Sequence, residues 1–276
     1  MTTLKTMLVQ VDGTHAASKR LAFALEVATR HGASLGVAFA VVPRFVPLPI
    51  PAGEGIPTAP LLQEIDGRHR LRARAAFERC CGDAPNVEWL DLAGSDVVER
   101  LVRRARLVDC VVLGQFDPDD AAGSDVPPHL IETVLVRSGV PALLVPQLGD
   151  TQPDPDSVLI AWKSAPEAAR ALASALPMLA RSSHIHVAVA ADAGPQDHDT
   201  GTILGFLAAH GVHGVHVHAG VQDGSAGDSL LSLAADTGAG LLVMGCYGHS
   251  RAREWLMGGA TRTVLASMTL PLWMAH

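Results

Sequence analysis

The sequence predicts an α/β protein built from two similar halves, each an open, five-stranded parallel sheet with helices on both faces. Two observations predict this class. Apolar strand-like runs alternate with Ala- and Leu-rich helical runs along the chain, and the second half repeats the pattern of the first. Because crossovers between parallel strands are right-handed, each connecting helix should cover a face of its sheet.

The repeat divides the chain into residues 1–148 and 155–276, with the polar linker QLGDTQPDPD, Gln147 to Asp156, between them. The first half opens with KTMLVQVDGTHAASKRLAFALEVATRHGASLGVAFAVV and the second with DSVLIAWKSAPEAARALASALPMLARSSHIHVAVAA. Each predicts a strand, a turn of small residues, a long helix and a second strand. We expect strands at 5–11, 34–42, 86–91, 109–114, 140–145, 157–162, 184–190, 213–219, 240–245 and 270–275, with helices in the gaps between them.

Two segments between these strands have unusual compositions. The apolar, proline-rich segment from Val42 to Pro60 cannot form a helix, so we expect it to cover a surface or contact a partner. The stretch from Glu64 to Arg79 has four arginines within eight residues, but it also carries acids. That mixture indicates an exposed helix face rather than a nucleic-acid site.

The composition narrows the class of partner and the compartment. The net charge is −7 and no long basic run occurs, which argues against duplex nucleic acid and anionic membranes as partners. No stretch approaches the roughly 20 apolar residues of a membrane span, and MTTLKTMLVQVDG lacks a signal-peptide core. The four cysteines form no CxxC pair. We therefore expect reduced cysteines and a cytoplasmic location.

The most informative stretch is LLVMGCYGHSRAREWLMGGATRTVL, residues 241–265. Its four glycines are Gly245, Gly248, Gly258 and Gly259. The first ends the fourth strand of the second half, and a helix begins soon after the last. Glycine lets a ligand approach the backbone closely, a helix N-terminus attracts anions, and Thr261 adds a hydroxyl donor. The pattern predicts a phosphate-binding loop, and the alternative is a connection that merely turns the chain.

The spacing Gly-x2-Gly-x9-Gly, followed by a small residue, resembles the ATP-binding signature of the universal stress protein (UspA) family. The strand runs MLVQVDG, VPALLVP and LPLWMAH resemble that family's first and last strands, so the chain is similar to tandem, two-domain members. The resemblance implies a Rossmann-like, adenine nucleotide alpha hydrolase-like fold. It also implies a stress-response role, dimerisation through the last strand, and binding of ATP or another adenine nucleotide, with Mg²⁺.

The nucleotide-binding residues that the resemblance implies all lie in the second half: Ala161, Trp162, Lys163, Gly245, Gly248, His249, Gly258, Gly259, Ala260 and Thr261. Each half departs from the family pattern. Asp12 matches the family aspartate that helps to hold adenosine, but Lys163 stands at the matching position of the second half. A role for Asp12 in a turn or helix cap is the alternative to a binding role. Lys163 either contacts a phosphate or points to solvent.

The glycine loop shows the opposite pattern, because the first half keeps only Gly114 of it. The segment that follows, QFDPDDAAGSDVPP, is rich in acids that would repel a polyphosphate. In the second half, Gly259 replaces the usual Ser or Thr, which leaves Thr261 as the nearest hydroxyl. Cys246 lies inside the loop as a small filler, with a redox role as the alternative.

We expect neither a metal site nor a catalytic constellation. The histidine pairs 184/186 and 216/218 alternate along two strands, but a zinc site needs three or four converging ligands. The sequence therefore favours a stress-response module that senses or carries an adenine nucleotide in its second half, with the first half as a scaffold. The alternatives are a slow ATPase and a protein-interaction module that binds no nucleotide.

The last strand of each half predicts how the halves assemble. VPALLVP and LPLWMAH are apolar edge strands whose unpaired backbone groups favour pairing. The linker holds both in one chain, so we expect Leu143 and Leu144 to pair antiparallel with Leu272 and Trp273 in a pseudo-twofold internal dimer. A homo-oligomer or an unknown protein partner would then use other surfaces.

Overall fold

The computed structural model describes residues 3–42, 58–82, 84–116, 126–127, 129–149, 151–190, 198–221, 226–246 and 259–276. The first half contains β1 (Thr6–Val11), α1 (His15–His31), β2 (Ser34–Phe39), α2 (Thr58–Cys81), β3 (Val87–Asp91), α3 (Val97–Ala105), β4 (Cys110–Gly114), α4 (Leu130–Ser138) and β5 (Ala142–Val145). The second half contains β6 (Ser157–Trp162), α5 (Pro166–Leu179), β7 (His184–Ala190), α6 (His198–Ala209), β8 (His216–Val221), α7 (Ala226–Asp236), β9 (Leu241–Gly245), α9 (Ala260–Ser267) and β10 (Leu272–Ala275).

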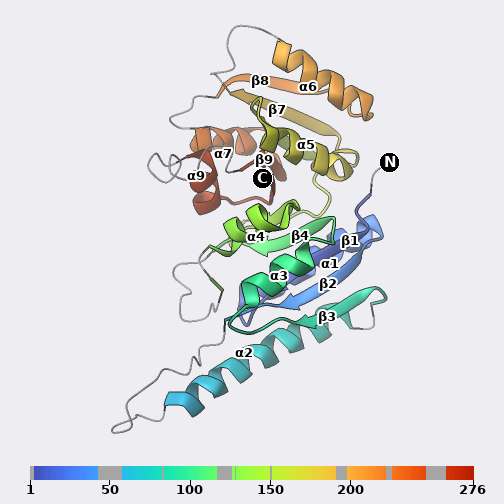
Figure 1. Ribbon diagram of the computed structural model, residues 1–276. Coiled ribbons are helices and arrows are strands. Elements are labelled where there is room, and N and C mark those ends of the chain that lie inside the picture. The colour runs from blue at the N-terminus through green and yellow to red at the C-terminus, as the bar shows by residue number, and fades with distance from the viewer. Residues whose placement is uncertain are drawn as a thin grey trace.

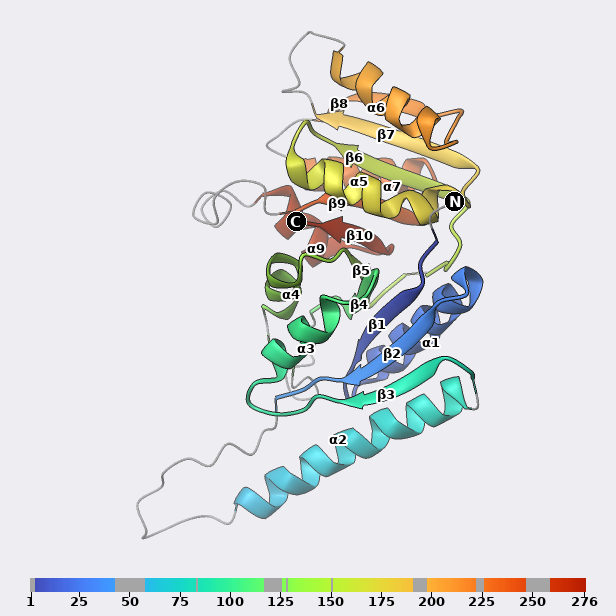
Figure 2. The ribbon, with the colours of Figure 1, turned by 45° about the vertical axis from the view of Figure 1, so that its right-hand side comes forward.

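All of these strands form one continuous sheet in the order β3-β2-β1-β4-β5-β10-β9-β6-β7-β8 (Figures 1 and 2). Neighbouring strands within each half are parallel, as the alternation of strands and helices predicts. The two halves have the same strand order, read outward from the centre of the sheet. The α/β class and the two five-stranded parallel sheets are therefore confirmed.

The halves meet where β5 and β10 pair antiparallel. Leu143 lies opposite Trp273, and Leu144 lies opposite Leu272, which confirms the expected pairing. Leu143 and Trp273 also hold equivalent places in their halves, so a pseudo-twofold axis passes between them. The Trp273 indole is fully buried and donates a hydrogen bond to Ser174 Oγ at 2.9 Å.

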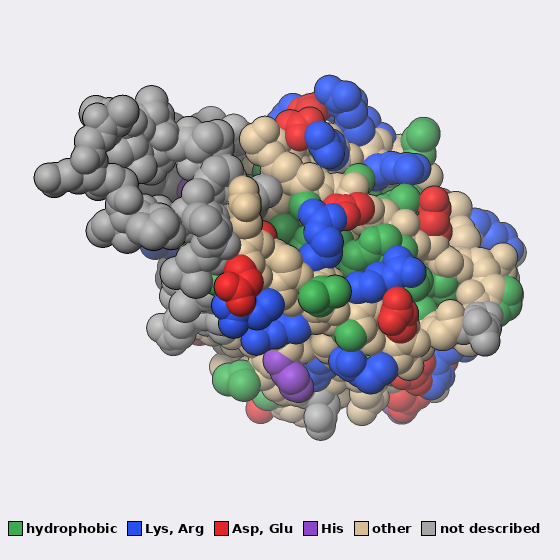
Figure 3. All heavy atoms as spheres, turned by 90° about the horizontal axis from the view of Figure 1, so that it is seen from below, with side chains coloured by type: hydrophobic (Ala, Val, Ile, Leu, Met, Phe, Trp, Pro, Cys, Tyr) green, Lys and Arg blue, Asp and Glu red, His purple; other side chains and the backbone are tan. Residues whose placement is uncertain are grey.

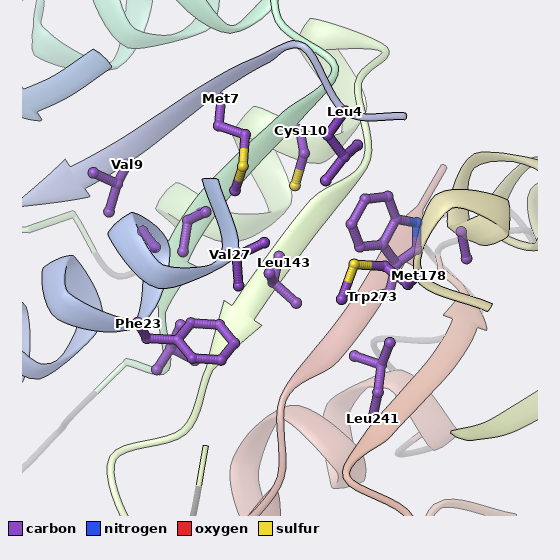
Figure 4. Packing of buried hydrophobic residues seen from close by; sticks show 14 of the residues in the cluster. Leu4, Met7, Val9, Phe23, Val27, Cys110, Leu143, Met178, Leu241 and Trp273 are labelled. Atoms are coloured by element: carbon purple, nitrogen blue, oxygen red, sulfur yellow. The ribbon is translucent and has the colours of Figure 1, made fainter. Parts of the chain in front are cut away.

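Helices cover both faces of the sheet. One face packs against α1, α2, α5 and α6, and the other packs against α3, α4, α7 and α9. The first of these cores crosses the junction between the halves, where Figure 4 shows Leu143 and Met178 close to Trp273. The apolar runs in the sequence thus bury both faces of every central strand.

Some of the expected boundaries are wrong. Helix α2 begins at Thr58, so the last three residues of the Val42–Pro60 segment are helical. Pro60 is accommodated because it lies in the first helical turn, where a backbone amide has no partner within the helix. The strand expected at 213–219 is β8, and it starts only at His216 because Gly214 adopts a left-handed turn with φ of 69°. Residues 43–57 lie outside the described part of the chain.

Helix α2 confirms the expectation of an exposed helix with mixed charges. Arg74 pairs with Glu78 at 3.0 Å, and Arg70 pairs with Asp91 of β3. Figure 3 shows the end of the molecule that lies lowest in Figure 1, and basic and acidic side chains are interspersed there. No helix among the described residues has both the length and the apolar character needed to cross a membrane.

The linker contributes an ion-pair bridge between the halves. Asp154 accepts two hydrogen bonds from Arg181, at 2.8 and 2.9 Å, and one from Arg30, at 3.3 Å. Arg30 lies at the end of α1, and Arg181 holds the equivalent place after α5. A single carboxylate therefore bridges two symmetry-related guanidinium groups, and the pKa of Asp154 is lowered, mainly by its hydrogen bonds from Arg181.

Removing this carboxylate is expected to weaken the contact between the halves only slightly. In Asp154→Ala, we expect the free energy of unfolding to fall by about 1 kcal/mol, because the network is partly exposed and solvent screens it. Urea denaturation at low and high salt measures this change. The loss should shrink at high salt, and a matched Asp156→Ala variant, whose carboxylate is more exposed, should lose less.

Candidate functional site

The topology places one ligand crevice in each half. In the first half, β1 is followed by β2 on one side, while β4 lies on its other side. The strand order thus reverses at β1, which makes a switch point outside the carboxyl ends of β1 and β4. The equivalent point of the second half lies at β6 and β9. Ligands of open α/β sheets bind at such points.

The crevice of the first half contains a buried ion pair. Asp12 follows β1, and its Oδ2 accepts a hydrogen bond from Arg20 Nη2 at 3.0 Å. Arg20 also donates to the backbone oxygen of Gln10 at 2.7 Å and to Gln10 Oε1 at 2.8 Å. Asp12 and Arg20 are each only 5% exposed. The structure thus gives Asp12 a role that the sequence analysis did not consider, as the buried partner of Arg20.

Thr14 completes the surroundings of this carboxylate. Its backbone amide donates to Asp12 Oδ1 at 2.9 Å, and its hydroxyl donates to the same oxygen. Thr14 itself caps α1 by accepting from Ala17, so Asp12 makes a turn before the helix rather than capping it. Burial alone would raise the pKa of Asp12, but the charge of Arg20 and the hydrogen bonds from Thr14 outweigh it and lower that pKa.

Arg20 also explains the glycine at the end of β4. A Cβ added at Gly114 would lie 2.0 Å from Arg20 Nη1, so a larger residue there would displace the guanidinium from its present position. The remaining cavity beside it is about 50 Å³. That volume suits a few water molecules, whereas small-molecule pockets usually exceed about 300 Å³.

The second half has different residues at the equivalent places. Because β1 and β6 hold the same position, Lys163 corresponds to Asp12, Ala161 to Gln10, and Ala171 of α5 to Arg20. Lys163 is partly exposed and Ala171 is buried. No side chain of arginine length therefore reaches this switch point from the position of Ala171.

The three predicted residues at the end of β6 do not share one face. Ala161 packs against the core beneath α7 and α9, whereas Trp162 packs against the core beneath α5. The buried Trp162 Nε1 has no hydrogen-bond partner among the described residues. Ala161 thus lies on the side of the sheet that carries α9, and Trp162 lies on the opposite side.

The start of α9 has the features of an anion site. Gly259 is the N-cap residue, and no side chain of the described residues caps the helix there. Ala260 and Thr261 follow in the first turn, which contains no acid, and Thr261 is only 6% exposed. The free amides of a first turn and its positive dipole end favour a negative ligand.

The equivalent helix of the first half starts very differently. α4 begins with Leu130 and Ile131 in place of Ala260 and Thr261, and its first turn carries Glu132. Bulky apolar side chains and a carboxylate disfavour a phosphate at this turn. The two crevices therefore differ at the strand end and at the helix start.

The glycine loop itself is described only at its two ends. Gly248, His249 and Gly258 lie outside the described residues. At Gly245, an added Cβ would lie 2.6 Å from the backbone nitrogen of Ala168, so close packing of α5 fills the space that the missing side chain leaves. Gly245 is thus required by the fold itself, in addition to any role toward a ligand.

Cys246 and the paired histidines make contacts between neighbouring strands of the sheet. Cys246 is buried and extends the pairing of β9 with β10 by donating its amide to the Ala275 oxygen at 2.9 Å. His186 Nδ1 lies 3.0 Å from His218 Nε2 across β7 and β8, and burial together with neighbouring imidazoles lowers the pKa of His186. Among the described residues, no group of three or more ligating side chains could hold a metal ion.

These features define a doubly wound α/β protein with one switch point in each half. Residues 154–276 match the Universal stress protein family, so the second half of the chain is a universal stress protein domain. No protein with a curated function matches the sequence.

Solved structures resemble the whole chain. A universal stress protein from Archaeoglobus fulgidus DSM 4304 is 18% identical, with a TM-score of 0.70 over 98% of this chain and 95% of its own. A functionally unknown protein from Pseudomonas aeruginosa PAO1 is 14% identical, with a TM-score of 0.58 over 99% of this chain and 92% of its own. At such identities, the likeness shows that both halves share the fold.

Arg20 and Asp154 are the important residues that the sequence analysis missed. Arg20 could have been noticed because it lies on the buried stripe of α1, three residues after Ala17 and four before Ala24. A charged residue on such a stripe needs a buried partner. Asp154 carries no comparable signal within a polar linker.

Proposed function

We propose that this protein binds one adenine nucleotide, such as ATP, ADP or AMP, in its second half and acts as a sensor or regulatory module. The phosphates would lie at the N-terminus of α9, and the adenosine near the ends of β6 and β9. We also propose that the halves are tandem domains, 1–148 and 155–276, in a cytoplasmic stress-response protein. Membership of the second half in the universal stress protein family supports the proposal.

The observation that carries the proposal is the first turn of α9. It contains Ala260, the buried Thr261 and the exposed Arg262, and it contains no acid. It also follows the Gly-x2-Gly-x9-Gly loop in the sequence. Lys163 adds a positive charge at the end of β6, which favours a phosphate over a neutral ligand. Mg²⁺ would accompany ATP through its phosphate oxygens.

Calorimetric titration of the full chain with ATP, ADP and AMP, with and without Mg²⁺, tests the proposal. We expect one nucleotide per chain and no binding to Gly248→Val, because the branched side chain would occupy the phosphate's space. Thr261→Val should bind about 5- to 10-fold more weakly, since it loses one hydrogen bond of about 1 to 1.5 kcal/mol. Thr263→Val is the matched control and should bind as the wild type does, because the Thr263 amide already bonds to the Gly259 oxygen at 3.3 Å.

Each alternative function has its own outcome in this experiment. Two nucleotides per chain would contradict the asymmetry of the two crevices. No binding of any nucleotide would leave a module that works through protein contacts. Release of inorganic phosphate during prolonged incubation with ATP would identify a slow ATPase. A Lys163→Asp variant that binds all three nucleotides with unchanged affinity would show that this side chain does not contact the phosphates.

A further inference from the structure

The crevice of the first half contains a side chain of the protein's own in the place of a ligand. We propose that Arg20 is an internal ligand of the first half, whose guanidinium group occupies the switch-point crevice between β1 and β4 and closes it to external molecules. This inference concerns the first half alone and holds whether or not the second half binds a nucleotide.

The protein binds the guanidinium group of Arg20 as a binding site holds a ligand, through several directed hydrogen bonds. Its Nε and Nη2 donate three hydrogen bonds, to the Gln10 backbone oxygen, Gln10 Oε1 and Asp12 Oδ2, at 2.7, 2.8 and 3.0 Å. A planar guanidinium group matches such a set of acceptors, because its donors diverge in fixed directions. The side chain reaches this position from α1 by passing over Gly114, where a Cβ would lie 2.0 Å from Nη1.

The second half shows that the fold itself does not require an arginine there. Ala171 holds the equivalent place on α5, and β6, β7 and β9 pair in the same register as β1, β2 and β4. Arg20 is therefore an addition to the common architecture rather than a part of it. It lies at the point where open α/β sheets bind their ligands.

The groups that receive Arg20 are held independently of it. Thr14 binds the other oxygen of the Asp12 carboxylate through its amide and hydroxyl. The Gln10 amide donates to the Ala40 backbone oxygen at 3.3 Å. Truncating Arg20 should thus leave a preformed site with one carboxylate and two further oxygen acceptors. Because all of these groups accept hydrogen bonds and one is negatively charged, the site should select a monosubstituted guanidinium cation.

The test uses the full chain with Arg20→Ala, and N-ethylguanidinium chloride as the probe. We expect this variant to unfold at a lower temperature than the wild type, and the probe at millimolar concentration to raise that temperature in a saturable way. Sodium chloride at equal ionic strength should not do so. The wild type should show no saturable response, because its crevice is already filled. Arg30→Ala, which truncates an exposed arginine of the same helix, is the matched control and should show none either.

Three results would overturn the proposal. The probe could leave folded Arg20→Ala unchanged, it could stabilise Arg30→Ala equally, or it could bind the wild type with the same affinity. If Arg20→Ala does not fold alone, the yield of folded protein after refolding with and without the probe decides the question, and an unchanged yield counts against the proposal. Nucleotide titration of the same variant separates the two proposals, because binding in the second half should be unaffected.

Discussion

Leu272→Pro is expected to split the ten-stranded sheet into two and to cause aggregation. Leu272 is fully buried in β10, between Leu144 of β5 and Leu242 of β9. Proline removes a backbone donor from the ladder and is therefore not tolerated in a central strand. Separated halves would then expose two apolar edge strands that pair with other molecules.

Light scattering coupled to size-exclusion chromatography measures this effect, together with thermal unfolding. Leu272→Val is the matched control, because it keeps the backbone donor and most of the side-chain volume and should stay monodisperse. A monodisperse Leu272→Pro protein with an unchanged unfolding temperature would show that the pairing of β5 with β10 does not hold the halves together.

Asp12→Ala is expected to produce the second large effect. The substitution leaves the Arg20 guanidinium buried without a counterion, and breaking a buried pair in this way typically costs about 3 to 5 kcal/mol. Urea denaturation should show a loss of that size. Asp156→Ala, which removes an exposed carboxylate, should change the free energy of unfolding by less than about 0.5 kcal/mol. Equal losses in the two variants would contradict a special role for the buried pair.

The same carboxylate predicts a pH dependence. The pKa of Asp12 is lower in the folded protein than its ordinary value, because Arg20 and Thr14 outweigh the opposing effect of burial. Its stabilising contribution is therefore complete above the unfolded-state pKa of about 4 and is lost as the pH falls through the folded value. The wild type should lose stability below about pH 4 more steeply than Asp12→Ala. Parallel pH profiles would contradict this assignment.

Much of the fold could be predicted because its causes are local and periodic. Apolar runs separated by helical patterns specify parallel strands. The apolar edge strands β5 and β10 lie in one chain, and their unpaired backbone groups favour pairing with each other. Strand ends were less predictable. At β8, the left-handed turn of Gly214 decides where pairing with β7 begins, and a composition pattern does not reveal such a turn.

The sites were harder to predict because long side chains cross between elements. Arg20 reaches from α1 over the end of β4 to Gln10 and Asp12. No sequence pattern links a residue on a helix stripe to partners at the end of a strand. Glycines posed the opposite difficulty. The sequence pattern assigns Gly245 to a phosphate-binding loop, whereas close approach of the α5 backbone already requires a glycine there.

The Asp154 bridge has a consequence for the symmetry of the two halves. In a dimer of separate, identical subunits, a residue near the twofold axis occurs twice, and two carboxylates there would repel each other. In a single chain that carries both copies, such a residue can occur once and serve both arginines. Positions between the halves are thus free from the constraint of symmetry, because one chain contains both halves.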